Sequence, residues 1–320
     1  MQMAFSSRCP AGIGPLRGPK SSSGSSSISS PRPSEARMQS LYVPKGPGPN
    51  VGGLRIAVCG KGGVGKTFVA GTLARLLARD GFRVLAVDCD SNPNLYVALG
   101  VPREELSGLV PISEDLDLVE ERTGSRPGSG WGSFFKLTPK VDDIPERYSL
   151  VGPDGVRLLV VGAPPRAGSG CLCPSLALVR ELLRHLVLYE RDIVILDMEA
   201  GLEHFGRAVA RGVDVMLLVA EPTERAIEAT RRMAELAEQM GVGELWPVLN
   251  KVMDEREARW GRGKVLELLR RPVKAIIPFD KGLLEADRMG LAPIDACPNS
   301  PAVRAVEALE ASLKAMLKEG

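Results

Sequence analysis

The sequence predicts a single doubly wound α/β domain, a mostly parallel sheet with helices on both faces. Three observations predict it. Short apolar runs alternate with amphipathic segments of helical length, a glycine-rich loop joins the first run to the first such segment, and acidic residues end several runs. This domain is expected over 51–320, with no further boundary inside it.

Seven runs rich in Val, Ile and Leu are predicted to be strands, because such runs separated by helices are typical of parallel sheets. They cover 55–60, 83–90, 156–162, 192–197, 214–220, 245–251 and 273–278. Helical spacing of apolar residues marks 68–79, 175–190 and 224–240. The stretch 303–317 is also apolar at helical spacing, with mixed charges, which indicates a core-packing helix and not a membrane anchor.

Composition excludes some function classes. Hydrophobic residues make up 44% of the 320, and no uninterrupted apolar run is long enough to span a membrane. Residues 1–50 carry a net charge of +5, which leaves the rest at −3 because the whole chain is at +2. A mildly acidic body argues against nonspecific nucleic-acid binding. We therefore expect neither nucleic acid nor membrane as a partner.

Residues 1–50 are predicted to be a disordered basic extension. They contain 12 Ser, 8 Pro and 6 Gly, and they show no apolar periodicity. Such a segment cannot bury enough surface to offset its ordering entropy. Three explanations stay open: a true start further on, for instance at Met38, an organellar transit peptide, or a functional tail.

The six cysteines do not suggest a disulfide scaffold, and a reducing cytoplasm fits their placement best. Cys59 and Cys89 lie inside predicted strands, whereas Cys171 and Cys173 form one close pair. In an extended Cys-Leu-Cys the two thiols point the same way, and Pro174 places Cys173 near a helix N-cap, where a thiolate is favoured. The pair supplies half of a tetrahedral metal site, which a two-fold dimer would complete. Alternatively, both are small buried hydrophobes.

The strongest motif is GKGGVGKT at 60–67, a phosphate-binding loop between a strand and a helix. Its backbone N–H groups and the helix dipole suit phosphate, Lys66 should reach the β- and γ-phosphates of ATP or ADP, and Thr67 should bind Mg²⁺. The predicted nucleotide contacts from this loop are Gly60, Lys61, Gly62, Gly63, Val64, Gly65, Lys66, Thr67 and Phe68.

Lys61 makes the loop resemble the deviant Walker A loop of MinD, ParA and nitrogenase iron-protein relatives. The resemblance implies that Lys61 reaches a dimer partner's nucleotide and is catalytic there. It also implies that Asp90 positions the attacking water, with Asp88 supporting Mg²⁺. Asp197 ends a strongly apolar strand, as an acid that binds Mg²⁺ through water does.

The adenine is expected to meet residues that follow later strands. In this family an Asn after the corresponding strand reads the base, which points to Asn250, since an amide can bond adenine N6 and N7 together. A turn Asn at a strand end is the alternative. Lys251 is also predicted to contact the nucleotide, and the loop from Pro278 to Asp280 to close the base pocket.

Three further segments resemble the CooC family, ATPases that load nickel into carbon monoxide dehydrogenase. They are DMEAGLEHFGR at 197–207, the C-x-C-P element, and KLTPKVDDIPERY at 136–148, within a resemblance that covers about 54–318. It implies a homodimer with one Ni²⁺ or Zn²⁺ held by Cys171 and Cys173 of both chains. Two residues depart from the family pattern. Met198 stands where Thr is usual, and Pro93 does not directly follow Asp90 as the family's proline does. Both departures bear on the rate of ATP hydrolysis. His204 is interpreted as packing the switch segment, with a transient metal ligand as the alternative, and His185 as structural.

The leading hypothesis is therefore a dimer-dependent ATP hydrolase that helps insert nickel into carbon monoxide dehydrogenase or acetyl-CoA synthase. An iron–sulfur carrier or reductase resembling the nitrogenase iron protein is the second class. A positioning ATPase of the MinD or ParA kind is the third. Metal content discriminates the first two, because an iron–sulfur protein is brown and a zinc protein is colourless.

Overall fold

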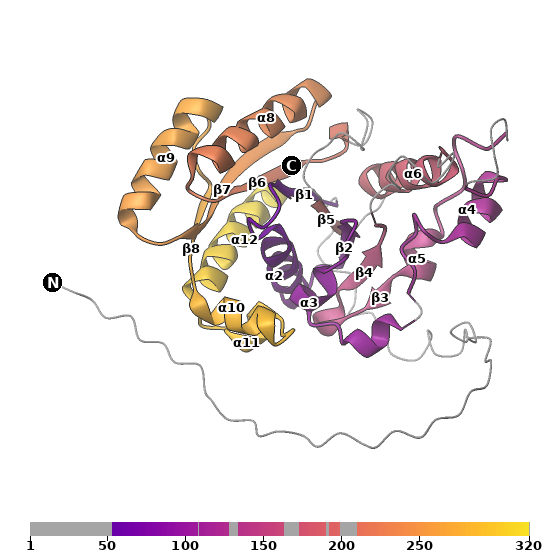
Figure 1. The fold of residues 1–320 in the computed structure, drawn as a ribbon, viewed down its shortest axis with the longest axis horizontal. Coiled ribbons are helices and arrows are strands. Elements are labelled where there is room, and N and C mark those ends of the chain that lie inside the picture. The colour runs from indigo at the N-terminus through magenta and orange to yellow at the C-terminus, as the bar shows by residue number, and fades with distance from the viewer. Residues whose placement is uncertain are drawn as a thin grey trace, which may run out of the picture. The chain divides into compact units, whose positions relative to one another are not determined.

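The computed structural model describes residues 53–107, 109–127, 134–162, 173–189, 192–198 and 210–319 (Figure 1). Within them lies an eight-stranded sheet with the order β3-β4-β2-β5-β1-β6-β7-β8. Every neighbouring pair is parallel except β3 and β4. The strands are β1 (Arg55–Gly60), β2 (Val84–Cys89), β3 (Leu150–Val151), β4 (Arg157–Val160), β5 (Ile193–Met198), β6 (Val215–Ala220), β7 (Glu244–Val252) and β8 (Ala275–Pro278).

Helices cover both faces of the sheet, and their buried side chains form two separate clusters (Figure 1). One face is covered by α4 (Leu116–Thr123), α5 (Ile144–Tyr148), α6 (Cys173–Tyr189), α8 (Glu224–Met240) and α9 (Glu255–Leu269). The other face is covered by α2 (Lys66–Arg79), α3 (Leu95–Leu99), α11 (Pro293–Ala296) and α12 (Pro301–Glu319), with α10 (Lys281–Arg288) beside them. Two short 3₁₀ turns, η1 (Arg103–Leu106) and η2 (Pro153–Gly155), complete the described elements.

The doubly wound α/β prediction is confirmed, and all seven predicted strands are present. Every residue of β2, β5 and β6 is buried, because helices lie on both sides of the sheet centre. The strand that the sequence did not predict is β3, which has two residues and lies at the sheet edge. Two residues are too few to produce a recognisable periodicity.

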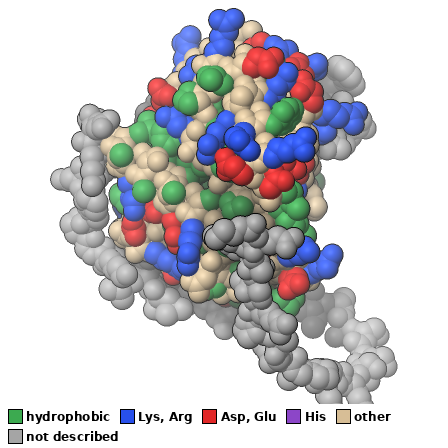
Figure 2. All heavy atoms as spheres, turned by 90° about the vertical axis from the view of Figure 1, so that its left-hand side faces the viewer, with side chains coloured by type: hydrophobic (Ala, Val, Ile, Leu, Met, Phe, Trp, Pro, Cys, Tyr) green, Lys and Arg blue, Asp and Glu red, His purple; other side chains and the backbone are tan. Residues whose placement is uncertain are grey.

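The C-terminal stretch is a core helix, as predicted. Helix α12 packs on α2 and β8 and buries Ala302, Val306, Leu309 and Leu313. No helix in the part of the chain that the structure describes is long and apolar enough to cross a membrane. On the face shown in Figure 2, acidic and basic side chains are interspersed.

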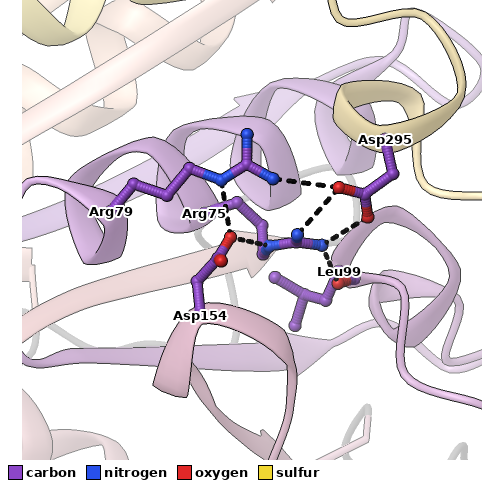
Figure 3. Close-up of polar contacts among 5 residues, drawn as sticks. All are labelled: Arg75, Arg79, Leu99, Asp154 and Asp295. Carbon is purple, nitrogen blue, oxygen red and sulfur yellow. Dashed lines mark hydrogen bonds and ion pairs between the residues drawn. The ribbon is translucent and has the colours of Figure 1, made fainter.

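Four charged side chains tie the middle of α2 to two distant segments (Figure 3). Arg75, whose side chain is 3% exposed, donates to Asp154 in η2 (2.5 Å), to both carboxylate oxygens of Asp295 in α11 (2.9 Å each) and to the Leu99 carbonyl (2.6 Å). Arg79, which is 39% exposed, donates to the same two aspartates. Because the phosphate-loop helix carries both arginines, this cluster fixes α2 against the C-terminal region.

Arg75→Met is expected to lower the free energy of unfolding by about 2–3 kcal/mol, because it removes charge-assisted hydrogen bonds and leaves a buried carbonyl without a donor. Arg79→Met is the matched control and should cost less than about 1 kcal/mol, since its side chain is exposed to solvent. Urea unfolding of both variants measures the difference. Equal losses in the free energy of unfolding would contradict the larger stabilisation assigned to the buried Arg75.

Candidate functional site

The loop between β1 and α2 has the form that phosphate binding requires. Gly60 ends β1 so close to β6 that a Cβ there would lie 2.3 Å from the Val219 carbonyl oxygen. Gly65, at φ 95°, immediately precedes α2. Lys66 is 8% exposed and its Nζ donates to the Lys61 carbonyl (3.4 Å). The Lys61 side chain, in contrast, is exposed.

Two predicted acids lie side by side next to this loop. The register of β2 and β5 pairs Asp88 with Asp197, and that of β1 and β5 pairs Val58 with Asp197. Both carboxylates are buried, at 1% and 2% exposure. Burial raises the pKa of Asp197 to about 7, against a hydrogen bond from Thr67 that lowers it, and the neighbouring Asp88 charge raises it further. One carboxylate oxygen of Asp197, Oδ1, has no hydrogen-bond partner.

Asp88 is held differently. Its Oδ1 accepts from the N–H of Asp90 (3.0 Å), and its Oδ2 accepts from Asn94 and Leu95 (2.9 Å each). Burial raises the pKa of Asp88, and these backbone hydrogen bonds oppose that rise. Asp88 thus anchors the loop that carries Asp90 and the start of α3. Its support of Mg²⁺ stays a prediction. Asp90 in turn accepts from the N–H of Asn92 (2.9 Å).

Asn250 and Lys251 both contact the phosphate loop. The Asn250 amide, 5% exposed, donates to the Val64 carbonyl (2.7 Å), and Lys251 Nζ donates to the Gly63 carbonyl (2.5 Å). A side chain at Gly65 would collide with this amide, since its Cβ would lie 2.3 Å from Asn250 Nδ2. The sequence predicted both residues as nucleotide contacts; the contacts seen here are with the loop itself.

The two remaining base-pocket candidates lie where β8 ends. Pro278 pairs with Val252 of β7. Asp280 caps α10 by accepting from the Gly282 N–H (2.8 Å), and its other oxygen accepts from the Ser300 hydroxyl (2.6 Å). Both Asp280 oxygens are therefore engaged within the protein. A hydrogen bond from the base to the Asp280 carboxylate would therefore have to share these acceptors.

Sequence reasoning missed Glu221, which follows the last residue of β6. Its carboxylate accepts from Lys251 Nζ (2.7 Å). The signal was available, because Glu221 is an acid directly after an apolar strand, as Asp197 is an acid at the end of one. It therefore joins the same edge of the sheet as the predicted residues.

Several predicted residues cannot be compared with the structure. Cys171 and 199–207, which include His204, lie outside the described residues. Helix α6 begins at Cys173, as the prediction of an N-cap near that residue requires, but the Cys173 side chain is also outside the description. His185 lies on α6.

Burial raises the pKa of Cys59 to about 12 and that of Cys89 well above its usual value, so these strand thiols stay protonated.

Known proteins share this arrangement. The family model of the CobQ/CobB/MinD/ParA nucleotide binding domain matches residues 56–294. An uncharacterised ATP-binding protein of Methanocaldococcus jannaschii is 44% identical over 74% of this chain and 90% of its own length. The carbon monoxide dehydrogenase accessory protein CooC of Rhodospirillum rubrum is 42% identical over 77% of this chain and 91% of its own length.

Solved structures show the same fold. The MinC:MinD cell division protein complex of Aquifex aeolicus aligns with a TM-score of 0.60 and 21% identity, over 82% of this chain and 96% of that one. Together with the family match, this places the phosphate loop and the strand-end acids in an ATP-binding ATPase fold. The chain therefore belongs to the CobQ/CobB/MinD/ParA family of nucleotide-binding ATPases and, within it, to the CooC type.

Proposed function

We propose that this ATPase is a dimerising metallochaperone that helps insert nickel into carbon monoxide dehydrogenase or acetyl-CoA synthase. Nickel or zinc is its cargo, one ion per dimer, held by Cys171 and Cys173 of both copies. The observation that carries this proposal is the 42% identity to CooC over 91% of that relative's length. Cys59 and Cys89 are free, buried thiols, which suits a reducing cytoplasm.

In the proposal, ATP or ADP binds over the loop at 60–67. Backbone N–H groups and the N-terminus of α2 bind the phosphates, because that helix end carries a partial positive charge. Lys66 contacts the β- and γ-phosphates from its buried position. Asn250 and the segment from Pro278 to Asp280 flank the base, and Lys251 acts at the phosphate loop.

The acidic edge fits Mg²⁺. Asp197 offers a buried carboxylate oxygen without a partner, and its hydrogen bond with Thr67 brings a hydroxyl beside it. Oxygen ligands of this kind, together with phosphate oxygens and water, are what Mg²⁺ prefers. Asp197 and Thr67 would hold the ion, and Mg²⁺ would supply positive charge to the phosphate oxygens. Asp90 orients the water that attacks the γ-phosphate.

Lys61 is assigned to the partner's nucleotide. Its side chain is exposed, whereas Lys66 in the same loop is buried and directed inward. One loop thus provides one lysine for its own phosphates and one for a second copy. Hydrolysis then depends on dimer closure, which couples the nucleotide state to the shared metal site.

Lys61→Ala should leave ADP affinity within about threefold of the parent and lower ATP turnover by about 100-fold, as loss of a transition-state contact does. Calorimetric titration with ADP and a phosphate-release assay provide the two measurements. Lys66→Ala is the control and should lose both properties. Parent-like turnover in Lys61→Ala would reject the contact across the dimer.

Asp197→Asn should stabilise the nucleotide-free protein in the presence of a chelator. With its pKa raised to about 7, Asp197 favours the folded state when protonated, so the parent loses stability as pH rises from the unfolded pKa toward 7. The advantage of the variant should therefore grow by on the order of 2 kcal/mol between about pH 5.5 and about pH 8. Urea unfolding at both pH values tests this. An advantage that does not change with pH would contradict the raised pKa.

Metal binding should saturate at one divalent ion per two chains, because two thiolates from one chain leave a tetrahedral site half complete. The ion and the dimer should stabilise each other, and ATP should strengthen both. Equilibrium dialysis with Ni²⁺ or Zn²⁺, combined with sedimentation, measures the stoichiometry and the association.

The control for that experiment is the double variant Cys171→Ala with Cys173→Ala, which should lose tight metal binding and keep ATP binding. One ion per chain, or metal binding that survives the double change, would reject the shared site. A brown protein with bound iron and sulfide would instead favour the iron–sulfur class.

A further inference from the structure

The strand that carries Asn250 and Lys251 contains a β-bulge at these residues. Leu249 pairs with Ile276 and Val252 pairs with Pro278, so β7 has one more residue than β8 between the two pairs. Lys251 adopts φ 60°, a left-handed conformation that costs a lysine energy. Neighbouring side chains of a regular strand point to opposite faces, and a bulge can redirect one of them. Here both side chains reach the phosphate loop.

Their targets are two consecutive peptide groups. Asn250 binds the Val64 carbonyl and Lys251 binds the Gly63 carbonyl, at 2.7 and 2.5 Å. In a trans peptide the C=O and the following N–H point in opposite directions. Fixing the Gly63 carbonyl therefore orients the Val64 N–H, which closes the loop onto the Lys61 carbonyl (3.3 Å). Fixing the Val64 carbonyl orients the Gly65 N–H.

Glu221 sets the position of the Lys251 ammonium group. Its carboxylate lies 2.7 Å from Nζ, and β6–β7 pairing of Ala220 with Leu249 brings the two residues together. The side chains of Lys251 and Glu221 are 38% and 35% exposed, so the ion pair itself adds little to the stability of the fold. What the pair provides is position, because the same ammonium group also contacts the Gly63 carbonyl.

We infer that Glu221, Lys251 and Asn250 form a brace that presets the phosphate loop, and that Glu221 is a positioning residue for binding of the nucleotide's phosphates. This inference rests on the proposed nucleotide site. A loop whose N–H groups are already oriented loses less conformational freedom when phosphate binds, which raises affinity. Asn250 retains one amide hydrogen and one carbonyl lone pair for the adenine, so it links the base to the same loop.

The direction in which Glu221→Gln changes ADP affinity distinguishes the brace from a direct electrostatic role of Lys251. If the ammonium acted on the phosphates by charge alone, Glu221→Gln would remove a competing negative charge and strengthen ADP binding. If the ammonium acts through the Gly63 carbonyl, Glu221→Gln loosens the loop and weakens ADP binding. The two mechanisms therefore predict opposite changes.

The test measures binding of Mg²⁺–ADP and of adenosine to the full-length protein by calorimetric titration. Glu221→Gln and Lys251→Met should each weaken ADP binding by about tenfold, the usual effect of losing one charge-assisted hydrogen bond. Adenosine binding should change less than about twofold, because it has no phosphate to use the loop. In the Lys251→Met background, Glu221→Gln should have no further effect.

Lys264 and Glu224 provide a matched control, since they form a similar ion pair (3.1 Å) between α9 and α8. Lys264→Met and Glu224→Gln repeat the charge changes and should leave ADP affinity within about twofold, with the melting temperature of all variants recorded. Unchanged or tighter ADP binding in Glu221→Gln would overturn the brace, as would additive losses in the double variant. Equal loss of adenosine binding would do the same. A parent protein that fails to bind ADP would overturn the proposed nucleotide site itself.

Discussion

The register between β2 and β5 is the constraint on which the site depends. It sets Asp88 beside Asp197 at the edge where the parallel strands end, next to the loop that follows β1. Two carboxylates that are almost completely buried at neighbouring positions repel each other and have lost most of their hydration. That arrangement is stable only with compensating donors or cations close by. The chain supplies Lys66 and Thr67 from the adjacent loop, and the proposal adds Mg²⁺.

The two acids differ in how many donors reach them. Three backbone N–H groups bind Asp88, which is thereby a structural anchor for the start of α3 and for Asp90. Asp197 keeps one oxygen without a partner, and its pKa is raised to about 7. An unsatisfied buried carboxylate is costly to the fold, and such cost is typical of functional positions. The backbone around each acid, and not the residue type, thus separates the anchor from the candidate ligand.

Much of the sheet and of the phosphate loop could be predicted from the sequence. Strands buried on both faces leave long apolar runs, so the sheet and its carboxyl-edge residues were predictable from pattern alone. The phosphate loop was predictable because its glycines and lysine have few other uses in that context. Glu221 also directly follows an apolar strand, but it belongs to no recognised motif, so the sequence did not single it out.

Other features leave no trace in composition. The bulge in β7 depends on one extra residue relative to β8, and nothing in a single sequence reports the register of two strands. The sequence therefore predicted Asn250 and Lys251 as nucleotide contacts, but not their contacts with the Val64 and Gly63 carbonyls. Asp280 is a similar case, because its partner Ser300 comes from a segment 20 residues away. The predicted role of Cys171 and Cys173 lies beyond what the described residues can test.

The brace and the exposed Lys61 together divide the phosphate loop into two parts. Side chains from β7 hold the peptide groups at 63–65, and Lys66 holds the carbonyl of Lys61, so the backbone is fixed from both sides. The Lys61 side chain remains exposed on this fixed backbone. In the proposed function, a loop held in this way would bind phosphate with little rearrangement, and Lys61 would meet the second copy at a defined position. In the proposed dimer, nucleotide state is then transmitted by the closing of two surfaces, and the loop itself need not change conformation.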